Sequence, residues 1–549
     1  MSSTDSVSPE LRKVEKEIDN YYKSNPLLTQ PFTTAAWHLL AYAEEYMLNE
    51  QRGGVSSVQD IHNLGSDFIT EIEHAMTWIY RECEQSGQIP FARDNDLYKA
   101  SKDLFELSQK YDWFIFAYTC ASGKDRVLDL ELQGSIIQPT GDFFASIEYE
   151  AYNILIDPRE PEEALRALNY ENLPILAIQA IQAIQQSLKI EGNRFRYEFN
   201  ENMVSDMKTY LKPFLDRMFL LPSWWEFSRY TLGEFRKVFE VICAIAHIHW
   251  IARIMAAKQG VIHKGYVDSL YMMTYGKLIR TVARYSGMSP IDVQSVLDDL
   301  TYGNSGITSP VPALQPLIKL NLKHYAIIPN IWICSAAERN FISLVNRLPS
   351  EKGIYQKYVN EKEDLMKECI KTRLFDTDFK SYSGNVANLT DVDLAIVSHS
   401  EKACLLLELK WFIAPTTAQE RIHKSKEIKE GISQILKLKQ AFADNHESLL
   451  KRLNIDSGYR LEGAVVSENW IGYSNVQSSD VPVIRANHLI EKLKATDNLQ
   501  STIDWLKERK YLPKEGEHFT VSRPKTRIGN WHLKWYGIQD HCRGVFFPL

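Results

Sequence analysis

Three charged residues in the second half of the chain have the types and spacing that metal-assisted hydrolysis needs. Asp393 precedes the apolar run Leu-Ala-Ile-Val, and Glu408 and Lys410 flank one leucine in the run Leu-Leu-Leu-Glu-Leu-Lys. Carboxylate oxygens suit Mg²⁺, which prefers oxygen ligands and keeps several of its waters. A lysine beside them can orient or deprotonate a water molecule and stabilise negative charge that develops on a phosphate. The three residues therefore indicate hydrolysis of a phosphate ester.

The pattern around these residues predicts a β-hairpin that would bring them together. Residues 391–397 alternate acidic and apolar residues and then run apolar, residues 398–402 are polar, and residues 403–412 form a second apolar run. Side chains alternate across a strand, so Glu408 and Lys410 project from one face. We expect the hairpin to place a carboxylate of its first strand beside them.

A metal site follows from the cost of burying those charges. Charged groups in an apolar strand are unfavourable unless they pair with each other or hold a cation. We expect Asp393 and Glu408, with the backbone carbonyl of Leu409, to bind Mg²⁺. Lys410 would then face the reacting phosphate. Asp391 is the alternative acid, because it lies two residues earlier on the same predicted strand.

At these positions the chain resembles the PD-(D/E)xK nuclease superfamily, whose pattern is an acid that opens one strand and Glu-x-Lys on the next. Here the acid is Asp393, and residues 408–410 are Glu-Leu-Lys. Val392 stands where the family commonly has proline, which leaves the choice between Asp391 and Asp393 open. We favour Asp393 because the apolar residues 394–397 follow it as the family's strand does.

The resemblance implies a restriction-endonuclease-like α/β core, in which a mixed central sheet is flanked by helices. The family order is helix, three strands, helix, strand, and residues 331–510 can supply it. The predicted elements are a helix at 355–374, strands at 379–385, 391–397 and 403–412, a helix at 419–444, a strand at 463–467 and a further short strand at 481–484.

The resemblance also implies further site residues and a cofactor. Many members carry an acid on the leading helix, for which Glu363 is the best match, with Glu361 and Glu368 as rivals. The helix after Glu-x-Lys often carries a glutamine that faces the site, and Gln434 occupies that place. Leu438 stands where one branch of the family has a tyrosine. The implied catalytic set, with Mg²⁺ as cofactor and Mn²⁺ as its substitute, is Asp393, Glu408, Lys410, Gln434 and Glu363.

The composition is that of a soluble globular protein with two or three domains. The chain has 549 residues, of which 44% are hydrophobic and 24% are charged. Its formal net charge of −7 argues against coating nucleic acid by bulk charge but leaves room for a local basic groove. Seven scattered cysteines and the lack of an apolar signal core favour the reducing cytoplasm. The apolar segment 238–257 contains charged and polar residues, so we expect a buried helix and no membrane association.

The sequence predicts a multidomain protein with a mainly α-helical N-terminal region. The expected division is a polar lead at the surface (1–30), a helical region that can include a small β element (31–160), a second helical region (161–330), the nuclease-like domain (331–510) and a basic and aromatic extension (511–549). The extension interleaves arginines and lysines with Trp531, Trp535 and Tyr536, a composition that can hold a nucleic-acid strand by charge and stacking.

Two other patterns offer competing chemistry. His247 and His249 have the spacing of a His-x-His metal pair, but residues two apart diverge on a helix, so we expect hydrogen-bonded histidines of a buried helix. Residues 278–285 and 290–300 can form a helix-turn-helix, although any two consecutive helices have this pattern and the second is not basic.

Together these features predict a metal-dependent endonuclease that hydrolyses phosphodiester bonds of DNA, with RNA as an open alternative. A role in restriction or antiphage defence is implied by the kinds of proteins that combine such parts. The N-terminal helices would serve in recognition, in regulation or in formation of a homodimer. The alternative is a catalytically inactive protein of nuclease fold that binds nucleic acid or supports an assembly. A third interpretation is a helical scaffold whose second half only mimics the motif.

Overall fold

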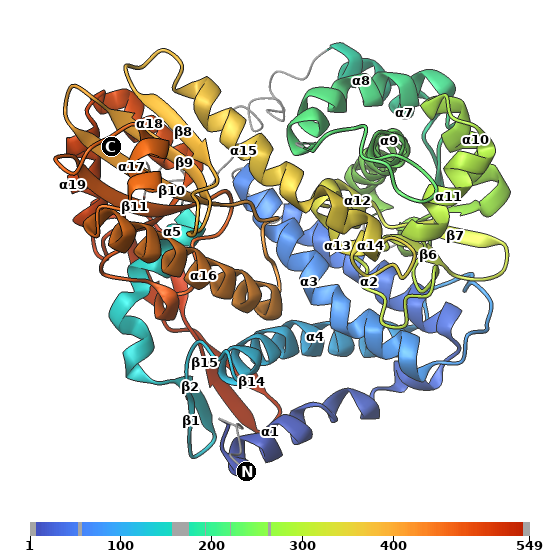
Figure 1. Ribbon diagram of the computed structural model, residues 1–549. Coiled ribbons are helices and arrows are strands. Elements are labelled where there is room, and N and C mark those ends of the chain that lie inside the picture. The colour runs from blue at the N-terminus through green and yellow to red at the C-terminus, as the bar shows by residue number, and fades with distance from the viewer. Residues whose placement is uncertain are drawn as a thin grey trace. The chain divides into compact units, whose positions relative to one another are not determined.

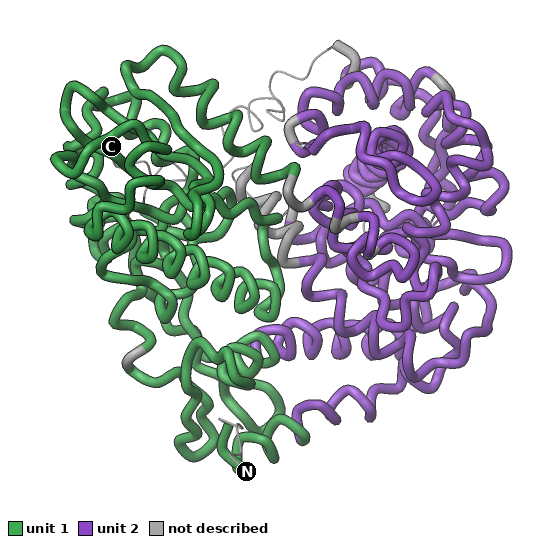
Figure 2. Tube along the Cα trace, in the orientation of Figure 1, with its two compact units in different colours: residues 1–16, 114–161, 359–549 green, residues 17–113, 162–358 purple. Residues whose placement is uncertain are grey.

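The computed structural model describes residues 7–52, 58–155, 175–192, 194–219, 221–261 and 265–541 (Figure 1). Within these residues the protein is mainly helical and contains several small sheets, as expected for a multidomain α/β protein. Two compact units are present, and each is built from segments that are not consecutive in sequence (Figure 2). Unit 1 comprises residues 1–16, 114–161 and 359–549, and unit 2 comprises residues 17–113 and 162–358. The units therefore differ from the consecutive regions expected from the sequence, and the boundary expected between residues 160 and 161 lies outside the described residues.

Unit 1 holds the predicted site. Its helices are the first part of α1 (Pro9–Ile18), the end of α4 (Asn95–Ala121), α5 (Ile147–Leu155), α15 (Val359–Arg373), α16 (Ala418–Ala443), α17 (Glu447–Leu453), α18 (Ala486–Thr496) and α19 (Leu499–Lys507). Its strands are β1 (Leu130–Gln133), β2 (Ile136–Pro139), β8 (Lys380–Gly384), β9 (Val392–Ser398), β10 (Ala403–Lys410), β11 (Arg460–Ser467), β12 (Val483–Arg485), β13 (Phe519–Ser522), β14 (Lys525–Ile528), β15 (Trp531–Lys534) and β16 (Gly537–Asp540).

A five-stranded mixed sheet forms the centre of unit 1, in the order β12-β11-β10-β9-β8. β10 pairs antiparallel with β9 and parallel with β11. Seven of its eight residues are buried, which explains why its sequence is an almost continuous apolar run. Helix α16 packs on β10 and β11 (Figure 1). The predicted helix, three strands, helix, strand order is present, with α15 starting at Val359 and β11 starting earlier than expected, at Arg460.

Part of the N-terminal half belongs to unit 1. Strand β2 pairs with β15 of the C-terminal extension, and the four strands β1-β2-β15-β14 form one sheet. Helix α5 is bound to the C-terminal segment as well: Asn153 donates to the carbonyl of Gly472 at 3.0 Å, and Tyr152 bonds to His488 at 3.1 Å. The expected small β element is thus real, but its partner strands lie almost 400 residues further along the chain.

The expectation for the N-terminal end of the chain is wrong. The polar lead is not a surface appendage, because α1 buries one apolar side of the helix, including Leu11 and Val14. Two of the three aromatic residues named in the C-terminal extension pack inside unit 1. Trp535 and Tyr536 pack against Phe143, with ring centroids at 6.5 and 5.2 Å.

Unit 2 contains the other helices, and its sheets are short. The helices are α2 (Phe32–Arg52), α3 (Val58–Glu82), most of α4, α7 (Ile175–Ser187), α8 (Glu201–Met218), α9 (Leu232–Ala256), α10 (Tyr275–Ser286), α11 (Pro290–Leu300), α12 (Pro329–Ile333), α13 (Ala337–Val345) and α14 (Lys352–Tyr355). The strands are β3 (Lys189–Glu191), β4 (Arg194–Arg196), β5 (Tyr271–Thr274), β6 (Leu317–Lys319) and β7 (His324–Ile327).

Helix α9 explains the apolar segment noted in the sequence. Among the described helices, α9 alone is long and apolar enough to span a membrane. In its most apolar stretch of 18 residues, 72% is buried inside the protein. His249 bonds to the carbonyl oxygen of Asp268 at 2.9 Å, and His247 bonds to that of Cys243 at 2.8 Å. The histidines are therefore hydrogen-bonded residues of a buried helix, as expected.

Glu150 of α5 gives unit 1 a pH-dependent stability. Burial raises its pKa to about 7, although the backbone N–H of Ser474 and the charge of Arg421 act in the opposite direction. In the folded protein Glu150 therefore stays protonated up to about pH 7, whereas in the unfolded chain it ionises at its lower, ordinary pKa. Its contribution to stability is complete below the unfolded pKa and is lost as the pH rises to about 7.

We expect Glu150→Gln to remove this dependence. When the pH rises from about 5 to about 8, the unfolding free energy of the variant should increase relative to that of the wild type by on the order of 3 kcal/mol. Denaturant titrations at both pH values measure it. Glu430→Gln, at an exposed position of α16, is the control. A difference that stays constant with pH would contradict the assignment.

Candidate active site

The predicted acids lie where the pairing of β9 with β10 ends. The antiparallel register runs as far as Leu407 opposite Leu394 and stops there. The next two positions in that register are Glu408 and Asp393. Directly opposite residues of an antiparallel pair project from the same face of the sheet. Both carboxylates therefore lie on one face, at the point where the two strands separate.

Beyond the last pair, the side chain of Asp393 takes the place of a backbone partner. Its Oδ2 accepts a hydrogen bond from the N–H of Leu409 at 2.9 Å. The N–H and C=O of one residue point to the same side of a strand, so the Leu409 carbonyl also faces the gap left where the pairing ends. A carboxylate and a backbone carbonyl thus lie on the same side of β10, as the sequence predicts.

Glu408 is the most constrained side chain of the site. It is only 4% exposed. The ammonium of Lys410 donates to its Oε1 at 2.8 Å, and the amide of Gln434, with its nitrogen toward Glu408, donates to both carboxylate oxygens. Burial, and then the negative charge of Asp393, raise the pKa of Glu408 to about 7, while Lys410 acts in the opposite direction. This carboxylate would be stabilised by a further cation.

Lys410 remains charged in this setting. Burial lowers the pKa of its ammonium, but the charge of Glu408 and the hydrogen bond to it outweigh burial, so the pKa is raised. Its backbone carbonyl accepts a hydrogen bond from the N–H of Glu468 at 3.2 Å, which extends the parallel pairing with β11. The end of β10 is therefore held on the β11 side and open on the β9 side.

Glu363 of α15 interacts electrostatically with two residues of the site. Burial raises the pKa of its carboxyl; the charge of Lys410 opposes this shift, and that of Asp393 adds to it. Its rival Glu368 is exposed and pairs with Lys371 at 2.8 Å.

The remaining alternatives lie outside this arrangement. Asp391 is exposed, precedes β9 and has no hydrogen bond or ion pair to any residue in the described ranges. No hydrogen bond or ion pair of Glu361 with a described residue joins it to the site.

Two glycines let α16 approach the sheet at this point, and the sequence analysis missed both. A Cβ on Gly431 would lie 3.0 Å from Cγ of Glu408 and 3.3 Å from Cε of Lys410. A Cβ on Gly463 of β11 would lie 2.4 Å from Cγ2 of Ile435. Glycine inside a helix costs about 1 kcal/mol relative to alanine. The presence of Gly431 in the middle of a long predicted helix was therefore a usable signal of close packing.

Two lysines lie at the edge of the site, of which Lys424 was expected only as one of several basic residues of the helix at 419–444 and Lys362 was not expected at all. The ammonium of Lys362 lies 4.7 Å from the ring centroid of Trp411, and that of Lys424 lies 4.9 Å from the ring centroid of Phe412. Burial, and then repulsion by Lys424, lower the pKa of Lys362 to about 8. No pattern in the sequence distinguishes Lys362 from other lysines of charged helices.

The donor set suits a hard cation that keeps waters. Among the described residues, no three side chains of Asp, Glu, His or Cys form a ready-made metal group. The site instead offers Asp393, Glu408 and the carbonyl of Leu409, which is a set of oxygen donors only. Mg²⁺ commonly takes one or two carboxylates and completes its shell with water. The residues present therefore fit Mg²⁺ and do not fit a cation that needs nitrogen or sulfur ligands.

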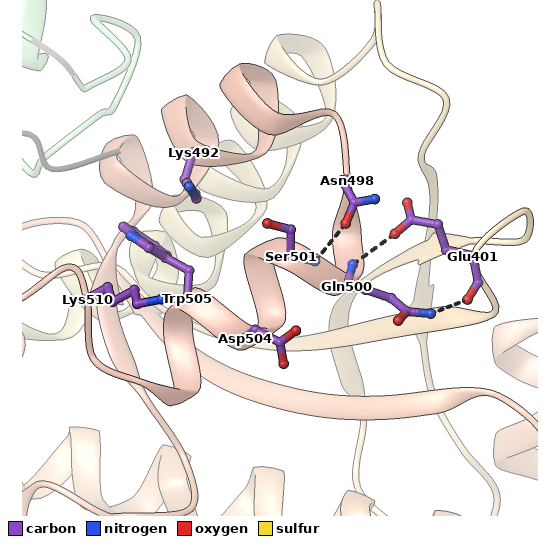
Figure 3. Close-up of a pocket in the computed structure, with 8 residues that line it drawn as sticks. All are labelled: Glu401, Lys492, Asn498, Gln500, Ser501, Asp504, Trp505 and Lys510. Atoms are coloured by element: carbon purple, nitrogen blue, oxygen red, sulfur yellow. Dashed lines mark hydrogen bonds between the residues drawn. The ribbon is translucent and has the colours of Figure 1, made fainter.

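An open pocket of about 670 Å³ lies elsewhere in unit 1 (Figure 3). Glu401, in the turn between β9 and β10, lines it and accepts hydrogen bonds from the backbone N–H groups of Leu499 and Gln500. Glu401 lies in the turn that precedes β10, whereas Glu408 lies five residues beyond Ala403, the first residue of that strand, which is roughly 17 Å along it. This pocket therefore belongs to the opposite end of the sheet from the site.

Comparisons with known proteins do not assign the chain. No family model matches it, and no curated protein or solved structure matches it either.

Gly463→Ala tests the close packing of α16 on β11. We expect a loss of about 1–3 kcal/mol in unfolding free energy, because the added methyl group collides with Ile435. Gly141→Ala is the matched control in the same unit, since a Cβ there has no atom within 4 Å. Urea titrations of both variants measure the effect. Equal stabilities of the two variants would refute it.

Asp393→Asn tests the metal ligands directly. We expect the affinity for Mn²⁺, measured by calorimetry, to fall at least tenfold, because a charged oxygen ligand is lost. Asp391→Asn removes the same charge two residues away and should bind Mn²⁺ like the wild type. An equal loss in both variants would mean that the choice of Asp393 is wrong.

Proposed function

We propose that this protein is a metal-dependent endonuclease of the PD-(D/E)xK kind, which hydrolyses phosphodiester bonds of DNA. One observation carries the proposal. Asp393 accepts a hydrogen bond from the N–H of Leu409 where β9 and β10 separate, and Glu408 and Lys410 project from that same end of the sheet. The presence of two acids, a carbonyl and a lysine at one end of the sheet supports the proposal.

The chemistry divides among these residues. Hydrolysis forms a bond between the water oxygen and phosphorus, breaks one ester P–O bond, removes a proton from water and delivers one to the leaving oxygen. Asp393, Glu408 and the Leu409 carbonyl would hold Mg²⁺, or Mn²⁺ in its place, which when bound supplies neutralisation of phosphate charge and acidifies bound water. Lys410, which pairs with Glu408 at 2.8 Å, would place its positive charge beside the attacking water and the phosphate oxygens.

Gln434 and Glu363 have supporting roles in the proposal. The Gln434 amide bonds to the Glu408 carboxylate and fixes its orientation. Glu363 adds a carboxylate on the α15 side of the site, where it can hold a water molecule or a second cation. Both are positioning residues until they are found in contact with substrate.

We place the enzyme in the cytoplasm and assign it to restriction or antiphage defence, with self-association through the helices of unit 2. The six cysteines within the described residues are free thiols, which agrees with a reducing compartment.

The alternative is an inactive protein of nuclease fold that binds nucleic acid or supports an assembly. One observation favours it: Glu408 already receives hydrogen bonds from Lys410 and Gln434, so its carboxylate is satisfied without a metal.

Cleavage assays separate the two functions. Supercoiled plasmid, single-stranded DNA and RNA are incubated with the protein in Mg²⁺, in Mn²⁺ and in EDTA. We expect metal-dependent cleavage of DNA by the wild type, and a loss of about a hundredfold or more in Lys410→Ala and Asp393→Asn.

Lys426→Ala is the matched control, because Lys426 is an exposed lysine of α16. It should cut like the wild type. Binding of DNA without cleavage under all conditions would favour the inactive protein, and normal cleavage by both site variants would place the active site elsewhere.

A further inference from the structure

A strongly basic surface lies on the hairpin formed by β14 and β15. The two strands pair antiparallel, with Lys525 opposite Lys534 and Arg527 opposite His532. Opposite residues share a face, and so do residues two apart on one strand. All four basic side chains therefore project from one face of the hairpin (strands labelled in Figure 1). We call these four residues the basic face.

The other face of the hairpin is buried. Ile528 and Leu533, at the alternate positions, are each 1% exposed. Lys525 and Arg527 are exposed, and Lys534 and His532 are half-buried. The core thus fixes which way the hairpin faces, and the basic face is the solvent side.

The basic face lacks the counter-charges that most charged surfaces have. Like charges directly opposite on two strands are destabilising, as in the pair of Lys525 and Lys534. Within the described ranges, no carboxylate lies within 4.0 Å of Lys525, Arg527 or Lys534. The whole chain has a net charge of −7, so this concentration of positive charge is a local exception.

Protection of a sheet edge does not explain the positive charge of the basic face. Lysines on edge strands prevent sheets from joining, and β14 is an edge strand of its sheet. β15, however, lies between β2 and β14. Lys534 and His532 therefore occupy an inner strand, where edge protection has no use for them.

We propose that the basic face binds the phosphate backbone of the nucleic acid on which the protein acts. This inference rests on the proposed function, which supplies a polyanionic substrate, and it adds a binding surface separate from the active site. Contacts of this kind give affinity without sequence selection and weaken as salt displaces them. Trp535 and Tyr536 take no part, because both pack on the core.

The test is the salt dependence of binding in EDTA, where cleavage does not interfere. Fluorescence anisotropy with a short labelled duplex compares the wild type with the triple variant Lys525→Gln, Arg527→Gln, Lys534→Gln. A plot of log affinity against log salt concentration should be less steep for the variant. We expect the magnitude of its slope to be smaller by roughly 2–3, since each lost phosphate contact reduces that magnitude by about 0.9. Affinity at low salt should fall more than tenfold.

Two further variants guard against trivial explanations. Lys380→Gln, Lys451→Gln, Lys494→Gln removes three charges from exposed positions elsewhere in unit 1 and should keep the wild-type slope. Lys525→Arg, Lys534→Arg keeps the charges and should also keep it. The first triple variant should be at least as stable to heat as the wild type, because it relieves repulsion.

Several outcomes would overturn the inference. These are an unchanged slope in the basic-face variant, an equal fall in the control triple variant, a failure of the wild type to bind duplex, or a loss of binding to vesicles of anionic lipid with duplex binding intact. The last would assign the face to a membrane surface. Binding that depends on the basic face without any cleavage would leave this inference standing and contradict the proposed hydrolysis alone.

Discussion

The burial of one carboxylate, that of Glu408, constrains the rest of the site. An ionised carboxyl in an apolar interior is unfavourable by several kcal/mol unless its oxygens are paired. Lys410 and Gln434 provide that pairing, and each comes from an element that must approach closely. Lys410 lies two residues further along the same strand, so the strand itself places it beside Glu408. Gln434 requires α16 to lie near the sheet, which in turn requires a residue without a side chain at Gly431.

The same constraint explains why β9 and β10 separate where they do. If the ladder continued, the backbone of β9 would fill the space beside Leu409. The side chain of Asp393 takes that position instead and satisfies the Leu409 N–H. The separation leaves the Leu409 carbonyl facing the gap beside the Asp393 carboxylate, while the Leu409 N–H stays paired. A sheet that is tightly paired from Leu407 to Ala403 thus opens within one residue into a site with oxygen donors.

The sequence predicted the parts of unit 1 that depend on local patterns. The β9–β10 hairpin, α15, α16 and β11 all follow from periodicity and turn residues, within a few positions. The pairing of β2 with β15 did not, because nothing in a single sequence links strands almost 400 residues apart. The short helices α17 and α19 were missed for a different reason, since seven and nine residues give too little periodicity to read. Among site residues, Asp393, Glu408 and Lys410 followed from residue type, whereas Lys362 is distinguished only by its burial against Trp411.

Positive charge occurs in unit 1 in two physically different forms, and the difference bears on how the proposed enzyme would divide its work. Lys410 is half-buried, paired with Glu408 and fixed by a neighbouring strand, so it can act on one phosphate with defined geometry but contributes little to capture. Of the basic residues of β14 and β15, Lys525 and Arg527 are exposed and Lys534 is half-buried, and none has a carboxylate within 4.0 Å in the described part of the chain, so they can attract a polyanion but cannot orient a reaction. A chain with a net charge of −7 repels nucleic acid at long range. Local capture by an exposed array and catalysis by a buried pair are then complementary requirements, because neither arrangement can perform the other's role.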